Sequence, residues 1–435
     1  MFTALLNSSL IHGAIPITIG ALSLVALGAV VSRRPARRWS ITFVVAGVAG
    51  ACLGFAIAWY LGDVRDDFGV TLALSTRAWL AIGVAGIAVA GVSLWRARRW
   101  RVPVGIASIV LFALLAAVGV NATVGEFPTV GDALGSDGVR PLTLSNRPPS
   151  VHPSVSAKPL WQSWRGPTNL ARTGTVGTVK IPATVSHFSA RRAVVYLPPA
   201  AIATNAPRLP VLIFLGGQPG SPQTVLSAGQ LPEIVDAFAD AHHGLAPIVV
   251  IPDQLGTPGA NPMCLDSPLG KVATYLTVDV PTWIKSHLGV LSGPRNWAIA
   301  GFSEGGTCSI QLGTKYRSLF GNILDISGQS APLNGSVVHT IKVGFGGSTV
   351  AYDAASATSL LAAGAPFSTT LGIFVVGQND TKYGQQSVVV ERAARAAHMQ
   401  VKSFLSPGTA HDWYTEQYGL RVGLPLLAER WGLGR

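Results

Sequence analysis

A serine between glycines carries the clearest chemical signal in this sequence. Residues 301–305 read GFSEG, a short apolar run (297–300) precedes them, and a helical pattern (306–316) follows. A serine on a tight turn between a strand and a helix presents its hydroxyl at the edge of a sheet, and the flanking glycines permit that turn. Ser303 is therefore predicted to be a nucleophile for acyl transfer. The alternative is an ordinary glycine–serine turn.

A serine hydroxyl attacks a carbonyl only with the help of a base, and the base needs an acid to orient it. In strand–turn–helix serine sites, the acid and then the histidine follow the serine along the chain. Asp380 is the first acid after the apolar run 372–376, and His411 is the only histidine after the last such run, 401–405. We therefore predict His411 as general base and then acid, and Asp380 as the orienter of its imidazole.

Other roles for these side chains stay open at this point. Asp380 could cap a helix that begins near Tyr383, and His411 could lie on a surface loop. Asp325 and Asp412 are rival acids, although Asp325 precedes the end of its strand and Asp412 is too close to His411 in sequence to reach across easily.

Acyl transfer also needs hydrogen-bond donors for the oxygen anion of the tetrahedral intermediate. One donor is predicted to be the backbone N–H of Glu304, the residue after the nucleophile. The other is expected from the loop after the run 211–215, where Gly217 or Gln218 is the candidate because Pro219 has no N–H. The Glu304 side chain is expected to lie at a helix N-terminus, where the helix dipole favours an acid.

The elements that position these residues are short apolar runs that alternate with helical patterns. Such alternation is typical of an α/β domain with a mostly parallel sheet covered by helices on both faces, and ligands bind at the carboxyl ends of its strands. The predicted strands are 193–197, 211–215, 247–251, 297–300, 323–326, 372–376 and 401–405, and the predicted helices are 278–288, 306–316 and 385–398.

The connection from residue 329 to residue 370 is much longer than most loops in such a domain. It contains a possible helix at 350–363. Because long insertions are often lids, we expect this segment to form a wall of the substrate site.

Two of the three cysteines fall near the predicted site. Cys264 follows the strand that ends at residue 251, and Cys308 lies five residues beyond Ser303 on the following helix. Both could therefore lie near the same sheet edge, and a location outside the cytoplasm would permit a disulfide. The alternative is a pair of buried free thiols.

The outer domain, over roughly residues 190–430, resembles the serine esterase family that includes esterase D and the actinobacterial mycolyltransferases, within the α/β-hydrolase superfamily. The resemblance lies in residues 215–220 (LGGQPG), 300–306 (AGFSEGG), 410–413 (AHDW) and 279–284 (DVPTWI). It implies carboxylic-ester hydrolysis or acyl transfer through an acyl-enzyme, with no metal or organic cofactor. The sequence departs from many relatives at residues 216–218, where they have a His-Gly pair, and this bears on the second oxyanion donor.

The first 120 residues have a different character. Only 12% of the 435 residues are charged, half the usual fraction, and the mean hydropathy is +0.41. Four apolar stretches approach the roughly 20 residues that cross a bilayer as a helix. They are residues 11–31, 41–61, 78–95 and 102–120. This composition excludes a disordered chain, and three cysteines exclude a disulfide-dense scaffold.

The net charge of +12 is concentrated beside the apolar stretches. Eight arginines form two blocks, one after the first stretch and one after the third, so these connections are expected to be cytoplasmic. The chain after the fourth stretch is then expected outside the cytoplasm. This distribution argues against nucleic acid as a partner. The arginines are Arg33, Arg34, Arg37, Arg38, Arg96, Arg98, Arg99 and Arg101.

The sequence thus predicts a multi-pass protein of the cell membrane in three parts. Residues 1–120 are a transmembrane region that acts as an anchor, 121–165 a Pro/Ser-rich extracytoplasmic linker, and 166–435 the catalytic domain. The leading hypothesis is a serine hydrolase of carboxylic esters, with lipid or cell-envelope esters as plausible substrates. The alternatives are an acyltransferase to a sugar or lipid hydroxyl and a noncatalytic surface-binding protein. A transporter is disfavoured because no stretch has an ionisable residue near its middle. The oligomeric state is left open.

Overall fold

The computed structural model describes residues 2–32, 37–66, 69–95, 97–136, 138–143 and 158–434. The chain divides into two compact units, residues 1–137 and residues 138–435, and each is described by itself. Arg33, Arg34, Arg96 and the linker residues 144–157 lie outside the described residues.

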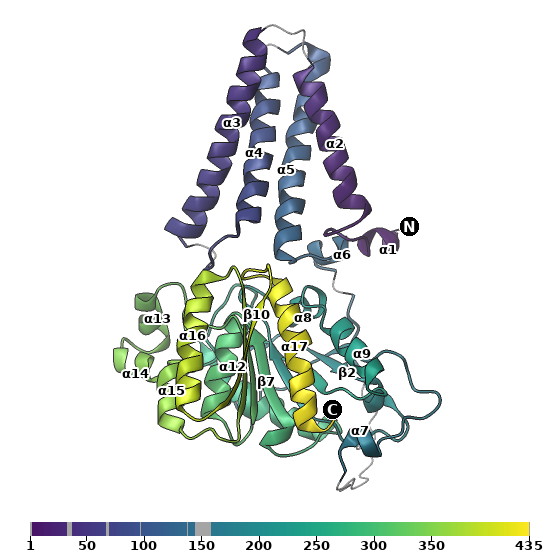
Figure 1. The fold of residues 1–435 in the computed structure, drawn as a ribbon, viewed down its shortest axis with the longest axis vertical. Coiled ribbons are helices and arrows are strands. Elements are labelled where there is room, and N and C mark those ends of the chain that lie inside the picture. Colours follow the sequence, from purple (N-terminus) through teal and green to yellow (C-terminus); the bar gives the residue numbers. More distant parts are fainter. Residues whose placement is uncertain are drawn as a thin grey trace. The chain divides into compact units, whose positions relative to one another are not determined.

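The first unit contains four long apolar helices (Figure 1). Each holds an 18-residue window of mean hydropathy 1.5 or more, and each is long enough to cross a membrane. The helices are α2 (Ala14–Val31), α3 (Arg37–Trp59), α4 (Leu74–Ser93) and α5 (Val102–Val124), with η1 (Tyr60–Val64) extending α3, η2 (Arg99–Arg101) preceding α5, and short α1 (Phe2–Leu6) and α6 (Val130–Ala133) at the unit's ends.

Glycines let helices α3 and α4 approach closely. A Cβ on Gly50 would lie 2.8 Å from the Cα of Ala85, and a Cβ on Gly54 would lie 2.7 Å from the carbonyl oxygen of Leu80. Any side chain at these two positions would therefore push the helices apart. Small residues serve this purpose in membrane helix pairs, where close backbone packing replaces the hydrophobic effect as the driving force.

The second unit is built on an eight-stranded sheet in the order β1-β2-β4-β3-β7-β8-β9-β10. The strands from β4 to β10 are parallel, whereas β1 and β2 pair antiparallel at one end. The strands are β1 (Thr175–Val179), β2 (Ala193–Leu197), β3 (Val211–Leu215), β4 (Ile248–Ile251), β7 (Trp297–Phe302), β8 (Asn322–Ile326), β9 (Leu371–Gly377) and β10 (Gln400–Ser406).

Helices cover both faces of this sheet, which explains why its central strands are rich in apolar residues. Gly313 of helix α12 (Glu304–Lys315) approaches the side chain of Ile323, while Gly419 of helix α17 (Trp413–Trp431) approaches that of Ile326. Ile323 and Ile326 are three residues apart on β8, so their side chains point to opposite faces. Helices α12 and α17 therefore lie on opposite sides of the strand that they share.

The remaining elements of the second unit surround this core (Figure 1). The helices are α7 (Leu160–Ser163), η3 (Pro199–Ile202), α8 (Pro222–Ser227), α9 (Leu231–Ala241), α10 (Val272–Thr274), η4 (Tyr275–Asp279), α11 (Val280–His287), η5 (Pro294–Asn296), α13 (Val337–Gly344), α14 (Thr349–Ala354), α15 (Ala357–Gly364) and α16 (Thr381–Ala396), and a small hairpin pairs β5 (Asp266–Ser267) with β6 (Gly270–Lys271).

The insertion between β8 and β9 differs from its prediction. The single helix expected at 350–363 is two helices, α14 and α15, and α13 precedes them. The break falls at Ser356, whose side chain accepts a hydrogen bond from the N–H of Ser359 and so caps α15. A serine that satisfies a helix N-terminus favours a new start over continuation.

Candidate active site

Ser303 lies on the one-residue turn between β7 and α12. Its φ is 59°, a region that side-chain-bearing residues seldom adopt and that is found at functional sites. Its N–H donates to the carbonyl oxygen of Ile326 on β8 at 2.8 Å, which holds the turn in place. A Cβ on Gly305 would lie only 2.1 Å from the carbonyl oxygen of Leu215, so this position requires glycine.

Three side chains from three strand ends meet at this turn. The Nε2 atom of His411 lies 2.8 Å from Oγ of Ser303, and its Nδ1 atom lies 2.8 Å from Oδ2 of Asp380. Asp380 follows β9 and His411 follows β10, as the sequence order requires. The side chains of His411 and Asp380 are only 7% and 2% exposed, so little water competes for these hydrogen bonds.

Aromatic rings hold the His411 imidazole from two directions. The ring centroid of Tyr383 lies 3.9 Å from that of the imidazole, and the centroid of Phe302 lies 5.0 Å away. Phe302 also packs against Trp413. No sequence pattern predicted these supports, although the position of Phe302 directly before Ser303 is a signal that could have indicated one of them.

The three candidate acids make different contacts. Oδ1 of Asp380 accepts from the N–H of Tyr383 and caps α16, while its Oδ2 contacts His411, so its position fits both roles that the sequence allowed. Asp412 caps α17 by accepting from the N–H of Thr415. Asp325 accepts from the N–H of Gly328, and burial raises the pKa of its carboxyl to about 7.

The loop after β3 passes directly beside the nucleophile. A Cβ built on Gly217 would lie 3.4 Å from the Cβ of Ser303. The side chain of Gln218 turns to a different neighbour, because its Nε2 donates to the carbonyl oxygen of Gly259 at 3.1 Å. The backbone N–H groups of Gly217 and Gln218 both remain candidates for the second oxyanion donor, beside that of Glu304.

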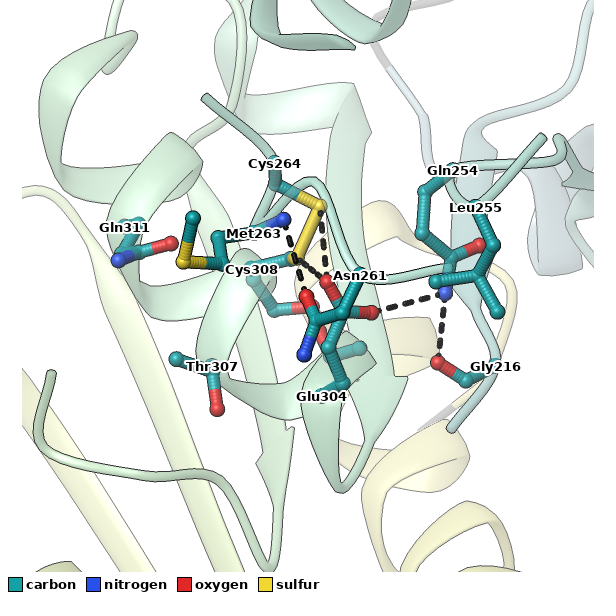
Figure 2. The surroundings of a disulfide bond; sticks show 12 residues. Gly216, Gln254, Leu255, Asn261, Met263, Cys264, Glu304, Thr307, Cys308 and Gln311 are labelled. Atoms are coloured by element: carbon teal, nitrogen blue, oxygen red, sulfur yellow. Dashed lines mark hydrogen bonds between the residues drawn. A yellow bond between two sulfur atoms is a disulfide. The ribbon is translucent and has the colours of Figure 1, made fainter. Parts of the chain in front are cut away.

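Cys264 and Cys308 form a disulfide with a Cα–Cα distance of 5.6 Å. Figure 2 shows it packed on the side chain of Glu304. The two sulfur atoms and a Glu304 oxygen lie within 4.8 Å of one another, a spacing that metal ions use. Both sulfurs are committed to the disulfide, however, so neither offers the thiolate that a metal would bind.

Glu304 begins α12, as expected, but its carboxyl is fully buried rather than facing solvent. Burial raises the pKa of this carboxyl to about 7. Its Oε1 atom lies 2.9 Å from Sγ of Cys308. A disulfide sulfur has no proton to donate, so a hydrogen bond here requires the proton to be on Glu304. The neutral acid therefore suits this environment better than the carboxylate.

Comparison with known proteins agrees with this architecture. Residues 188–419 match the model of a family described as putative esterase. An uncharacterized protein of Corynebacterium glutamicum is 34% identical over 253 residues, which are 57% of this chain and 59% of that protein. The chain thus spans less than two thirds of the length of this relative.

Two solved structures share the fold of the second unit. A ferulic acid esterase superposes with a TM-score of 0.51 and 18% identity, covering 61% of this chain and 100% of that one. An S-formylglutathione hydrolase of Agrobacterium tumefaciens superposes with a TM-score of 0.50 and 22% identity, covering 60% and 97%. At these identities the likeness shows the fold, which is that of the α/β hydrolases.

Proposed function

The chain belongs to the putative esterase family, and from this premise we propose that it is a membrane-anchored serine hydrolase that cleaves carboxylic esters outside the cytoplasm. The observation that carries the proposal is the pair of 2.8 Å contacts that joins Ser303 to His411 and His411 to Asp380. A noncatalytic binding protein would have no need of this arrangement in a buried and strained setting.

The chemistry proposed for this site proceeds through an acyl-enzyme. Oγ of Ser303 attacks the ester carbonyl while Nε2 of His411 takes its proton, and Asp380 stabilises the imidazolium through Nδ1–H. The N–H groups of Glu304 and of the loop after β3 bind the oxygen anion of the tetrahedral intermediate. His411 then protonates the departing alcohol, and the same residues activate water to release the acid.

The membrane part of the proposal rests on helices α2 to α5. Arg38 at the start of α3 and Arg98, Arg99 and Arg101 between α4 and α5 belong to the two basic blocks, which are expected on the cytoplasmic side. Because the connection between α2 and α3 is expected on the cytoplasmic side, the N-terminus is outside. The four crossings by α2 to α5 then return the chain to the outside before the second unit begins. The catalytic unit is then outside, and its attachment favours lipid or cell-envelope esters as substrates.

The activity is tested with a fluorophosphonate probe and a panel of p-nitrophenyl esters of increasing chain length, with the full-length protein in detergent. Wild type should be labelled and should hydrolyse at least one ester, and Ser303→Ala should lose both while keeping its melting temperature. Labelling that survives in Ser303→Ala would refute the nucleophile. An added alcohol such as trehalose shows whether the acyl group passes to a hydroxyl in preference to water.

The orientation is tested separately on intact cells. An external protease should digest the second unit without permeabilisation, whereas a tag placed between α2 and α3 should stay protected. Protection of the second unit would overturn the proposed side of the membrane without affecting the proposed chemistry.

A further inference from the structure

Gln254 is a buried residue that contacts both segments expected to supply oxyanion donors. It follows β4 and is 3% exposed. Its Nε2 atom donates to the carbonyl oxygen of Gly216 at 2.7 Å and to Oε2 of Glu304 at 3.1 Å (Figure 2). One amide group therefore uses both of its protons to join the loop after β3 to the residue after the nucleophile.

The first of these contacts sets the direction of the Gly217 N–H. The carbonyl of Gly216 and the N–H of Gly217 belong to the same peptide group, which is planar and trans, so the two bonds point in opposite directions. Because Gln254 holds the carbonyl oxygen on one side, the N–H must point to the other. Gly217 is also the loop residue that passes beside Ser303, so the contact fixes the loop where it approaches Ser303, and the N–H of either Gly217 or Gln218 can serve as the second donor.

The second contact acts on the other donor. Glu304 supplies its backbone N–H next to Ser303, and its side chain is held from two sides. Oε2 accepts from Gln254, and Oε1 lies against the Cys264–Cys308 disulfide. With the side chain fixed at both oxygens, the first turn of α12 has little freedom to rotate its N–H away from the reacting carbonyl.

The segment that carries Gln254 is itself anchored to the same two elements. The carbonyl oxygens of Pro258 and Gly259 accept from the N–H of Gly220 and from the Gln218 side chain. At its far end, the disulfide joins Cys264 to α12. Residues 252–264 are thus held against both the loop after β3 and helix α12. Within this segment, Gln254 contacts both elements.

We propose that Gln254 is a positioning residue that aligns the backbone N–H groups of Glu304 and of the loop after β3 as the two donors of the oxyanion hole. It does not contact the reacting atoms, and it acts through the orientation of those two groups. This inference rests on the proposed function, since an oxyanion hole matters only where an acyl group is transferred.

Gln254→Met tests the inference, because methionine fills similar volume without a donor. Losing a whole oxyanion donor lowers turnover by about 10²–10³, and misaligning two donors should lower kcat by roughly 10- to 100-fold with KM changed less than about threefold. The affinity of a trifluoromethyl ketone, which forms an oxyanion on the serine, should fall by the same factor as kcat/KM.

Gln417→Met is the matched control. Gln417 is also buried, and its Nε2 donates to the carbonyl oxygen of Ala228 at 2.8 Å; among the described residues, its side chain makes no hydrogen bond to the loop after β3 or to Glu304. Gln254→Met loses two buried hydrogen bonds and Gln417→Met loses one, so both melting temperatures should fall, that of Gln254→Met further. Only Gln254→Met should lose kcat and ketone affinity.

Gln254→Glu supplies a readout that a purely structural role would not move. Its carboxyl keeps the shape of the amide but can donate at most one hydrogen bond, and only when protonated, so its activity relative to wild type should fall as the pH rises. Two results would overturn the inference: a kcat for Gln254→Met equal to that of Gln417→Met, or a lowered kcat with unchanged ketone affinity. If wild type itself hydrolyses no ester, the proposed function fails instead.

Discussion

The carboxylate of Asp380 contacts the N-terminus of α16 and the imidazole of His411 at the same time. Oδ1 accepts from the N–H of Tyr383 at 3.1 Å, and Oδ2 lies 2.8 Å from Nδ1 of His411. The cap fixes the acid's direction before any substrate binds. The residue that caps α16 therefore also holds the imidazole of His411 in position.

Asp380→Asn is expected to separate these two roles. Asparagine caps helices as well as aspartate does, so the melting temperature should change little. The amide cannot stabilise an imidazolium or fix the required tautomer, and the equivalent change in a serine protease lowers kcat by about 10⁴. Ester hydrolysis by the purified full-length protein provides the measurement.

Asp236→Asn is a suitable control for that variant. Asp236 Oδ1 accepts from the N–H of Gly174 and from the Tyr196 hydroxyl, and asparagine retains this oxygen. Its kcat should equal that of wild type. If Asp380→Asn also kept wild-type kcat, Asp380 would not be the orienting acid.

Tyr383 is expected to support catalysis through its ring. Its centroid lies 3.9 Å from that of the His411 imidazole, and such aromatic contacts contribute roughly 0.5–1.5 kcal/mol. Tyr383→Ala should therefore lower kcat by roughly 2- to 12-fold, because the imidazole gains freedom to leave Ser303. Tyr383→Phe keeps the ring and should stay within about twofold of wild type. Equal losses in the two variants would assign the effect to the hydroxyl instead.

The parts of the fold that the sequence predicted are those with one dominant signal. Strands β3, β7 and β9 are buried on both faces, so they read as continuous apolar runs. Strand β1 was missed because it lies at the sheet's end and contains threonine and glycine. Helix α17 was missed because Pro425 interrupts its pattern, although proline is tolerated there in the folded chain.

The residues of the candidate site also differ in how well the sequence predicts them. Ser303, Asp380 and His411 each follow a strand, so chain order alone could pick them out, and the structure places them within hydrogen-bonding distance. The partners that support them leave no such mark. Gln254 and Tyr383 matter because of what they contact across the sheet edge, and contacts between distant segments are not written in local sequence patterns.

Stability should depend on pH through Glu304. Its pKa is about 7 in the folded protein against an ordinary value of 4.5, so the folded state holds a proton that the unfolded state releases. The stabilisation is complete below pH 4.5 and is lost as the pH rises to 7. This difference between the folded and unfolded pKa values corresponds to about 3 kcal/mol in the free energy of unfolding. Asp325, raised to about 7 from 3.8, acts in the same direction and the same range.

Thermal melting of the full-length protein between pH 4.5 and 8 measures this effect. Wild type should lose stability across the range, and Glu304→Gln should lose less, because its amide is neutral at every pH. Asp325→Asn is the parallel variant for the second carboxyl. A pH dependence unchanged in Glu304→Gln would show that this carboxyl does not keep its proton on folding.

The disulfide should stabilise the second unit and hold residues 252–264 against α12. It joins cysteines 44 residues apart, and closing a loop of that length stabilises a protein by up to about 4 kcal/mol in the chain-entropy treatment. The double variant Cys264→Ala/Cys308→Ala should therefore melt roughly 10 °C lower than wild type. Its kcat should also fall, because Glu304 loses the contact at Oε1.

Cys52→Ser, which removes the remaining free cysteine, should match wild type in both measurements. A double variant with wild-type melting and wild-type kcat would mean that the bridge neither stabilises the unit nor helps to position the residue after the nucleophile.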